Sequence, residues 1–172
     1  MSSSARACTR SRNAIHSGVP IDISLDDAVA IPAATLKQLK AELKRMVRAA
    51  ALTDKRTDYE VALRFCNDRE IRVLNRDYRG KDKPTDVLAF AHREGPTAAL
   101  HPNVLGDIVI SVDTAKKQAK RGLHAELLHL ASHGLCHLLG YDHNTDEEEA
   151  AMNARAAALR AEAKRTGRTR AA

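Results

Sequence analysis

Three histidines lie within the eleven residues 133–143, and their spacing, HxxxHxxGxxH, is the strongest chemical signal in the sequence. Residues four apart on an α-helix share one face, about 6 Å apart along the axis, so His133 and His137 can point at one metal ion. Gly140 is placed to end this helix, because glycine enters the left-handed C-terminal conformation without steric cost. The turn that follows can bring His143 back to the same ion. Three imidazoles with an open fourth position are typical of a catalytic zinc site.

The residue after the first histidine is Gly134, and this absence of an acid narrows the chemistry. Zinc peptidases with the same spacing carry their general base, a glutamate, at that position. A metal hydroxide could still form, and three neutral imidazoles leave the double charge of the ion uncompensated, which favours an anionic substrate such as a phosphodiester. Asp142, Asp146 and Glu147 are near enough in sequence to offer another base. The pattern therefore disfavours proteolysis without excluding it.

Two neighbours of these histidines are not predicted to be ligands. His129 precedes His137 by two turns, about 12 Å, and is too distant to share its ion. We expect His129 either to orient one of the metal-binding histidines through a hydrogen bond or to be a solvated helix residue. Cys136 is rotated by about 100° from His137 and is interpreted as a small core residue. Satisfied polar residues on a packed helix without metal are the alternative for the whole cluster, which three histidines at so close a spacing disfavour.

The second informative stretch, LNRDYRGKDKPTDVLAF, spans residues 74–90. Gly80 and Pro84 are expected to end a helix, and a strand is expected from residue 86. The loop between them exposes Arg79 and two lysines. An arginine held beside a metal hydroxide would bind a phosphate through two N–H groups and stabilise the charge that develops during attack. An ordinary polar turn is the alternative, and the residue pattern alone favours that alternative.

The elements that must position these residues follow from the apolar periodicity of the chain. Strands are predicted at 19–25, 58–66, 86–90 and 105–112, the last mostly apolar as in a central strand covered on both faces. Helices are predicted after Pro32 to about 52, from an Asp68 N-cap to about 78, after an Asp113 N-cap, through the histidine segment, and from Asp146 past Leu159. We therefore expect an α/β (α+β) fold with a small mixed sheet of about four strands flanked by helices, and a metal site on a central helix and the turn after it.

At 172 residues the chain is long enough for one domain with a proper core. Residues 1–18 are serine-rich and basic without an apolar segment, which predicts a disordered tail, with a short organellar transit peptide as the alternative. Residues 19–162 are predicted to form the hydrolase domain, and residues 163–172 a frayed basic tail. Cys8, Cys66 and Cys136 include no CxxC pair, which indicates reduced thiols and a cytoplasmic location.

The composition points to a polyanionic partner. The net charge is +6 and the isoelectric point about 9.4. Aromatic residues make up only 3% of the chain, so base stacking is not expected and a nucleic acid would be held mainly through its phosphates. The first helix carries basic residues along one side, which are either a solvated face or a track for a phosphate backbone: Lys37, Lys40, Lys44 and Arg48. No apolar run approaches the ~20 residues that cross a bilayer, so no membrane partner is expected.

Three blocks of the sequence, YRGKDKPTDVLAF, LGDIVIS and HGLCHLLGYDH, resemble the YbeY family in the family's own order. The resemblance covers about residues 19–159 and leaves both termini outside. It implies a metal-dependent endoribonuclease of bacterial rRNA maturation, with a small mixed sheet flanked by helices. It also implies that His133, His137 and His143 hold one zinc ion per chain and that Arg79 is the active-site arginine. Cys136, Ala89 and Ala91 depart from the family pattern, but none of them removes a ligand or the arginine.

The resemblance further implies single-stranded RNA as the substrate, including the 3′ end of 16S rRNA, and the ribosome or ribosome-assembly proteins as partners. Either water or the 2′-hydroxyl of the RNA is compatible with the pattern as the nucleophile. Two other functions remain open on the residues alone. One is a zinc metallopeptidase that recruits a different carboxylate, and the other is a non-catalytic ribosome-assembly module with a structural metal. The pattern sets neither the choice among zinc, nickel and cobalt nor an oligomeric state.

Overall fold

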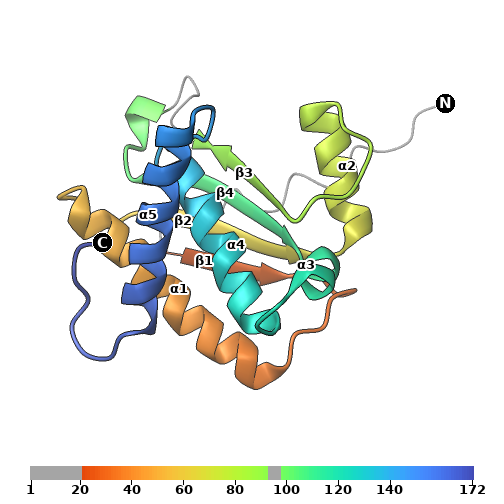
Figure 1. Ribbon diagram of the computed structural model, residues 1–172, viewed down its shortest axis with the longest axis horizontal. Helices are drawn as coiled ribbons and strands as arrows, with labels where there is room; N and C mark the ends of the chain where they lie inside the picture. Colours follow the sequence, from red (N-terminus) through yellow and green to blue (C-terminus); the bar gives the residue numbers. More distant parts are fainter. Residues whose placement is uncertain (1–20, 93–97) are drawn as a thin grey trace.

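The computed structural model describes residues 21–92 and 98–172, so the predicted tail 1–18 and the first two residues of the predicted strand lie outside the described residues (Figure 1). The elements in chain order are β1 (Ile21–Leu25), α1 (Ala33–Thr53), β2 (Glu60–Cys66), α2 (Asp68–Arg79), β3 (Val87–Ala91), a 3₁₀ turn η2 (Ala98–Leu100), β4 (Val104–Ser111), α3 (Val112–Gln118), α4 (Leu123–Leu138) and α5 (Asp146–Lys164). Every helix and strand expected within these residues is present, with bounds shifted by one or two positions.

The four strands form one mixed sheet in the order β1-β2-β4-β3. β1, β2 and β4 run parallel, and β3 pairs antiparallel with β4 from Val87 opposite Ile110 to Ala91 opposite Gly106. Helices α1, α4 and α5 pack together, with α4 lying across the strands (Figure 1). On the opposite face, Ile71 of α2 packs with Cys66, Leu88 and Val109. The predicted α+β fold with a mixed four-stranded sheet is confirmed.

Helix α1 forms because its apolar residues recur every three or four positions and therefore share one face. The residues on this face are fully buried against the sheet and the neighbouring helices: Leu39, Leu43, Met46, Val47 and Ala50. The four basic residues of the predicted stripe are all exposed on the other side. The periodicity thus fixes which face of the helix supports the core beneath α4.

The N-caps of α2 and α3 differ from the prediction by one and two residues. Asn67, not Asp68, caps α2, because its Oδ1 accepts a hydrogen bond from the Glu70 N–H at 2.9 Å. Ser111, not Asp113, caps α3. Adjacent polar residues compete for a cap position, and the residue with extended backbone geometry holds it. The helices themselves are correctly predicted.

The displaced Asp68 instead connects the N-terminus of α2 to α3. Its carboxylate accepts hydrogen bonds of 2.6 Å each from the hydroxyls of Ser111 and Thr114 and from the ammonium of Lys117. Burial alone would raise the pKa of Asp68, but the hydrogen bonds from Lys117, Ser111 and Thr114 outweigh it and lower the pKa to about 2. The ionised carboxylate is therefore part of what holds α2 in place.

This network predicts a component of acid sensitivity. The folded pKa of Asp68 lies below its unfolded value of 3.8, so its contribution to stability is present above that value and is lost as the pH falls towards 2. Between pH 5 and pH 2, the free energy of unfolding of the wild type should fall by about 2 kcal/mol more than that of Asp68→Asn. Urea denaturation across this range measures the difference. Parallel curves for the two proteins would contradict the prediction.

The chain after α5 differs from the predicted frayed tail. Residues up to Lys164 are helical, and the last eight residues have no helix or strand. They nevertheless return to α1, where an Arg45 N–H donates to the Gly167 carbonyl at 2.7 Å and the backbone N–H of Ala172 donates to the Ala49 carbonyl at 3.3 Å.

Among the described helices, none combines the length and apolarity that a bilayer crossing requires.

Candidate metal centre

Helix α4 carries two of the three histidines on a scaffold that is otherwise almost entirely buried. Six leucines around the histidines are predicted to form an apolar side. Leu139 is only partly buried, and the other five are at most 3% exposed: Leu127, Leu128, Leu130, Leu135 and Leu138. His133 and His137 are half-buried, whereas His129 is exposed and belongs to the solvated face. Cys136 is fully buried, as expected for a core residue. Packing therefore fixes the rotation of α4 and with it the direction of both rings.

A Schellman motif ends α4 and turns the chain towards the third histidine. Gly140 adopts a φ of 92°, and its N–H donates to the His137 carbonyl at 3.0 Å. The N–H of Tyr141 donates to the Cys136 carbonyl at 3.0 Å, which completes the motif. The predicted role of Gly140 is confirmed. Five residues later Thr145 begins α5 in a capping box with Glu148, so the segment that carries His143 is held at both ends.

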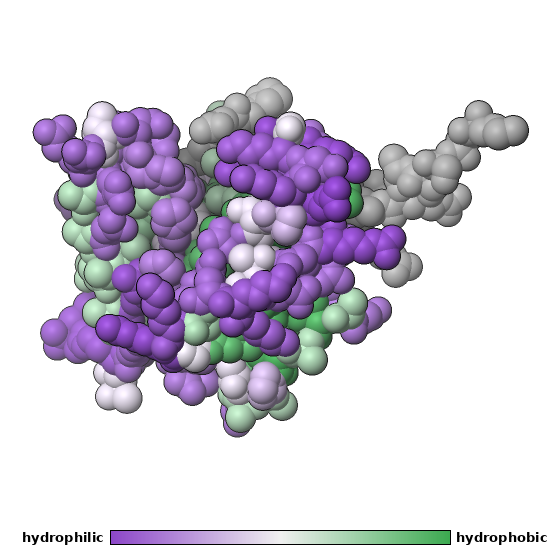
Figure 2. Space-filling view, turned by 45° about the vertical axis from the view of Figure 1, so that its right-hand side comes forward, coloured by the Kyte–Doolittle hydropathy of each residue, from purple (hydrophilic) through white to green (hydrophobic). Residues whose placement is uncertain are grey.

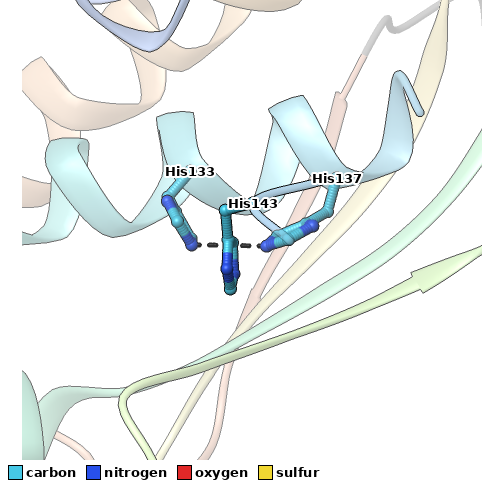
Figure 3. Close-up of side chains that lie close together, drawn as sticks. All are labelled: His133, His137 and His143. Atoms are coloured by element: carbon cyan, nitrogen blue, oxygen red, sulfur yellow. Dashed lines mark hydrogen bonds between the residues drawn. The ribbon is translucent and has the colours of Figure 1, made fainter. Parts of the chain in front are cut away.

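The three rings converge on one point (Figure 3). One ring nitrogen from each histidine lies within 4.8 Å of the other two, and the Nε2 atoms of His133 and His137 are 3.3 Å apart. Two imidazoles bound to one tetrahedral zinc ion at its usual bond length would have nitrogens roughly 3.3 Å apart. The structure thus brings together the three residues that the sequence selects, and it places His133 and His137 at the spacing of ligands to one ion.

The protonation state of the rings suits metal binding. Nδ1 of His137 lies 3.1 Å from the Tyr141 carbonyl, which can only accept, so Nδ1 carries the proton and Nε2 presents its lone pair to the cluster. Burial, reinforced by repulsion from His137 and His143, lowers the pKa of His133 to about 4. Burial and repulsion from His143 also lower the pKa of His137. Both rings are therefore neutral at pH 7, the form that coordinates a metal.

A pocket of about 150 Å³ lies between α4 and β3 and contains the histidine cluster. Its lining combines α4, the turn after it, the end of α2 and the start of β3: Arg79, Thr85, Asp86, Val87, Ala89, His133, Gly134, His137 and His143. The structure therefore places Arg79 in the same pocket as the three histidines. Its side chain is exposed and has no hydrogen-bond or ion-pair partner in the described part of the chain. The guanidinium is thus available to an anion in this pocket.

Asp86 is the residue of this pocket that the sequence reasoning missed. Its Oδ1 accepts a hydrogen bond from the Val87 N–H at 2.8 Å, and its Oδ2 accepts one from the Gln118 amide at 3.2 Å. Its charge acts on His133 from within the pocket, opposing the effect of burial on the pKa of that ring. The signal that could have found it is its position directly before a strand and next to the arginine loop. An acidic residue there faces whatever packs on the strand.

The three acids considered from sequence do not line the described pocket. Asp142 is engaged in its own turn, where its carboxylate accepts hydrogen bonds from the His143 N–H at 2.9 Å and from the Asn144 amide at 2.7 Å. Asp146 and Glu147 lie in the first turn of α5, where acids complement the helix dipole. Asp86 is therefore the carboxylate that the fold presents to a substrate beside the histidines.

Gly134 has a packing reason to be glycine. A Cβ atom at this position would lie 2.8 Å from Cγ2 of Ile108, a residue of the central strand β4. Helix α4 thus approaches the sheet more closely than any other residue at 134 would allow. A glutamate at this position, as in zinc peptidases, would bring its Cβ into the same contact, so Ile108 or α4 would have to shift to accept it. The packing therefore adds a steric argument against proteolysis to the chemical one.

We expect Gly134→Ala to destabilise the protein even though alanine is the better helix former. Overpacking typically costs about 1–3 kcal/mol and the gain in helix propensity returns about 1 kcal/mol, so a net loss of about 1 kcal/mol is expected. Urea denaturation measures it. The same substitution in an Ile108→Ala background should cost much less, because the clash is gone. Equal effects in both backgrounds would show that the close approach is not the cause.

Fold and site together define a single-domain α+β protein whose central helix presents a histidine cluster able to hold a metal ion. Comparison with known proteins assigns it more closely. The chain belongs to the YbeY family, because the family model described as Endoribonuclease YbeY matches residues 26–164. The resemblance noted from the three sequence blocks is confirmed.

Relatives in several bacteria carry the same description. Endoribonuclease YbeY of Geobacillus kaustophilus is 47% identical over 130 residues, which cover 70% of this chain and 83% of the relative. Endoribonuclease YbeY of Synechococcus sp. (strain RCC307) is 44% identical over 145 residues, covering 81% and 86%. The solution structure of TM1509 from Thermotoga maritima matches with a TM-score of 0.55 at 26% identity, over 83% of this chain and 88% of that one. The fold is thus shared with a solved structure.

Proposed function

We propose that the protein is a zinc-dependent endoribonuclease that hydrolyses phosphodiester bonds of single-stranded RNA. The observation that carries the proposal is the convergence of His133, His137 and His143 in one pocket with Arg79. Membership of a family described as an endoribonuclease supports the reaction. The glycine at 134, where zinc peptidases carry a glutamate and where a Cβ would crowd Ile108, supports a phosphodiester over a peptide as the bond that is cut.

The donor set fits a divalent zinc ion held by the three histidines. Neutral imidazoles suit zinc, the 3.3 Å separation of two Nε2 atoms agrees with its ligand geometry, and three protein ligands leave a position open. Bound there, the ion would supply Lewis acidity to a phosphate oxygen and make water more acidic. Arg79 and Asp86, which line the same pocket, would bind the phosphate and accept a proton.

Arg79 is the phosphate-binding residue of this proposal. Its guanidinium can donate two parallel N–H bonds to the non-bridging oxygens of a phosphodiester, and these bonds strengthen as negative charge develops during attack. Asp86 accepts the proton that the nucleophile loses, whether that nucleophile is water or the 2′-hydroxyl of RNA. Its carboxylate is suited to this because the Val87 N–H and the Gln118 amide hold it in one orientation.

The biological substrate is proposed from what the resemblance of the three sequence blocks implies. Ribosomal RNA is the partner, with the 3′ end of 16S rRNA as the processing site, in the cytoplasm and in contact with the ribosome or with ribosome-assembly proteins. Low aromatic content agrees with recognition through phosphates rather than through stacked bases, and the net charge of +6 agrees with a polyanionic partner.

Asp86→Asn is expected to slow RNA cleavage by about 10²-fold or more while zinc content stays at one ion per chain, because the amide cannot accept a proton. Single-turnover cleavage and elemental analysis measure the two quantities. Asp146→Asn is the matched control, since that exposed acid lies in the first turn of α5 and outside the described pocket lining. Full activity of Asp86→Asn would remove Asp86 from the mechanism.

A cleavage assay on a defined single-stranded RNA, with and without chelator, tests the proposal as a whole. Zinc-loaded protein should cut the RNA at internal bonds, and chelator should abolish the cut until zinc is restored. The same preparation should leave casein intact. Cleavage of casein but not of RNA would establish the peptidase instead. RNA binding without cleavage, together with unfolding on metal removal, would establish a structural metal in an assembly module.

A further inference from the structure

The segment after α2 is folded back on its helix and is not an ordinary polar turn. Gly80 takes the left-handed conformation, with φ of 68°, and its N–H donates to the Arg76 carbonyl at 3.0 Å. The N–H of Lys81 then donates to the carbonyl of Asn75 at 3.2 Å. The chain thus reverses directly after Arg79 and runs back beside the last turns of α2.

Two side chains of α2 hold this reversed segment. Asn75 is only 2% exposed, and its amide donates to the carbonyl of Lys83 at 2.8 Å. On the surface, the guanidinium of Arg72 forms two parallel bonds of 2.8 and 2.9 Å with the carboxylate of Asp82. We call the Asn75–Lys83 and Arg72–Asp82 pairs together the loop clasp.

The two pairs of the loop clasp are not equivalent. The side chains of Arg72 and Asp82 are 54% and 53% exposed, and ion pairs at such sites contribute little to stability. Asn75 is different, because a buried amide that loses its acceptor remains unsatisfied. Hydrophilic side chains cover this α2 side of the molecule, which is turned forward in Figure 2. A buried asparagine beneath such a surface indicates that its hydrogen bond is needed to hold the backbone of residues 80–83 in place.

The segment that the loop clasp holds, residues 80–83, lies between two residues that line the metal pocket. Arg79 precedes the clasped segment and Asp86 follows it, and both reach the same pocket as the histidines. The distance in space between Arg79 and Asp86 is fixed only if residues 80–83 stay folded on α2. The guanidinium of Arg79 has no partner of its own in the described residues, so its position depends on the backbone that carries it.

We propose that Asn75 is a positioning residue, which holds Arg79 in its phosphate-binding orientation through the hydrogen bond to the Lys83 carbonyl. This inference rests on the proposed role of Arg79 and adds a residue outside the pocket to it. Misplacement of a catalytic group by about 1 Å can cost about 10²-fold in rate. Loss of the Asn75 amide should therefore impair RNA cleavage without touching the metal ligands.

A double-mutant cycle on kcat tests the inference, with Asn75→Ala, Arg79→Ala and the double variant assayed as zinc-loaded full chains on one single-stranded RNA. Asn75→Ala should lower kcat by about 10- to 100-fold in the wild type and by less than about 2-fold when Arg79 is already alanine. Zinc content should be unchanged in all of them. Anisotropy measurements of RNA binding to chelator-treated protein give a second readout, in which Asn75→Ala should weaken binding no more than Arg79→Ala does.

Two further variants keep the test decisive. If Asn75→Ala does not fold, Asp82→Asn removes the weaker, surface pair of the loop clasp and should show the same dependence on Arg79 with a smaller effect. Asp77→Asn is the matched control, because Asp77 pairs with Arg76 at 2.9 Å on the same helix and has no contact with the clasped segment among the described hydrogen bonds. It should leave kcat unchanged.

The outcomes separate this inference from the proposed function. Equal losses from Asn75→Ala with and without Arg79 would overturn the positioning role and leave the function of Arg79 intact. No loss in the wild type would do the same. If Arg79→Ala itself cleaves RNA at the normal rate, both the positioning role and the proposed role of Arg79 fail, whereas zinc-dependent cleavage still stands.

Discussion

His137→Ala is expected to release the metal ion and to reduce RNA cleavage by about 10³-fold or more. Removing an outer partner of a ligand already costs roughly 10- to 100-fold in metal affinity, and removing a ligand should cost more. Without the ion the reaction loses several kcal/mol of charge stabilisation. Elemental analysis after dialysis measures the first effect, and single-turnover cleavage measures the second.

His129→Ala is the matched control on the same helix, since His129 is exposed and does not line the described pocket. It should retain one zinc ion and full activity. Comparison of the two variants also exposes contaminating ribonuclease, because a contaminant would give the same residual cleavage in every preparation. Stoichiometric zinc in His137→Ala would contradict the three-histidine site.

Arg79→Ala is expected to lower kcat by about 10²- to 10³-fold while zinc stays bound. That range is typical of losing one preorganised group that stabilises developing charge. The positive charge of Arg79 is among the influences that lower the pKa of His137, after burial and His143. Its removal should therefore not weaken the metal site. Cleavage kinetics under saturating RNA and zinc analysis of the same samples test both statements.

Arg79→Lys separates charge from geometry. Lysine keeps the positive charge but not the planar fork that binds two oxygens, so an intermediate loss is expected. Arg76→Ala, one turn earlier on the exposed face of α2, should have little effect on kcat because its guanidinium pairs with Asp77. A normal rate for Arg79→Ala would show that phosphate is bound elsewhere.

Local signals made the histidine cluster predictable. The i, i+4 spacing of His133 and His137, the leucines around them and the glycine that ends the helix all act within one helix and one turn. The strand pattern was similarly local, and the mostly apolar run predicted at 105–112 corresponds to β4, Val104–Ser111, one of the two interior strands of the sheet. Such features survive folding because a helix or strand buries its apolar face whatever its partner is.

Competition between neighbours and long-range contacts account for what the sequence did not reveal. Asp68 is as good a cap as Asn67 in isolation, but its carboxylate instead accepts hydrogen bonds from the hydroxyls of Ser111 and Thr114. Asp86 gains its place in the site only when β3 pairs with β4 and α4 packs over them. These partners lie tens of residues away, and no periodicity indicates them.

The narrow gap between position 134 and Ile108 also restricts how this scaffold could evolve. A substitution that introduced glutamate into the helix would place its Cβ against Ile108 and would therefore cost stability before it offered any new reactivity. A chain would have to shrink Ile108 first, and that step alone would leave a cavity in the core with no catalytic benefit. The shared spacing of the histidines is therefore not enough to turn this chain into a peptidase, because the added carboxylate also needs space between α4 and β4.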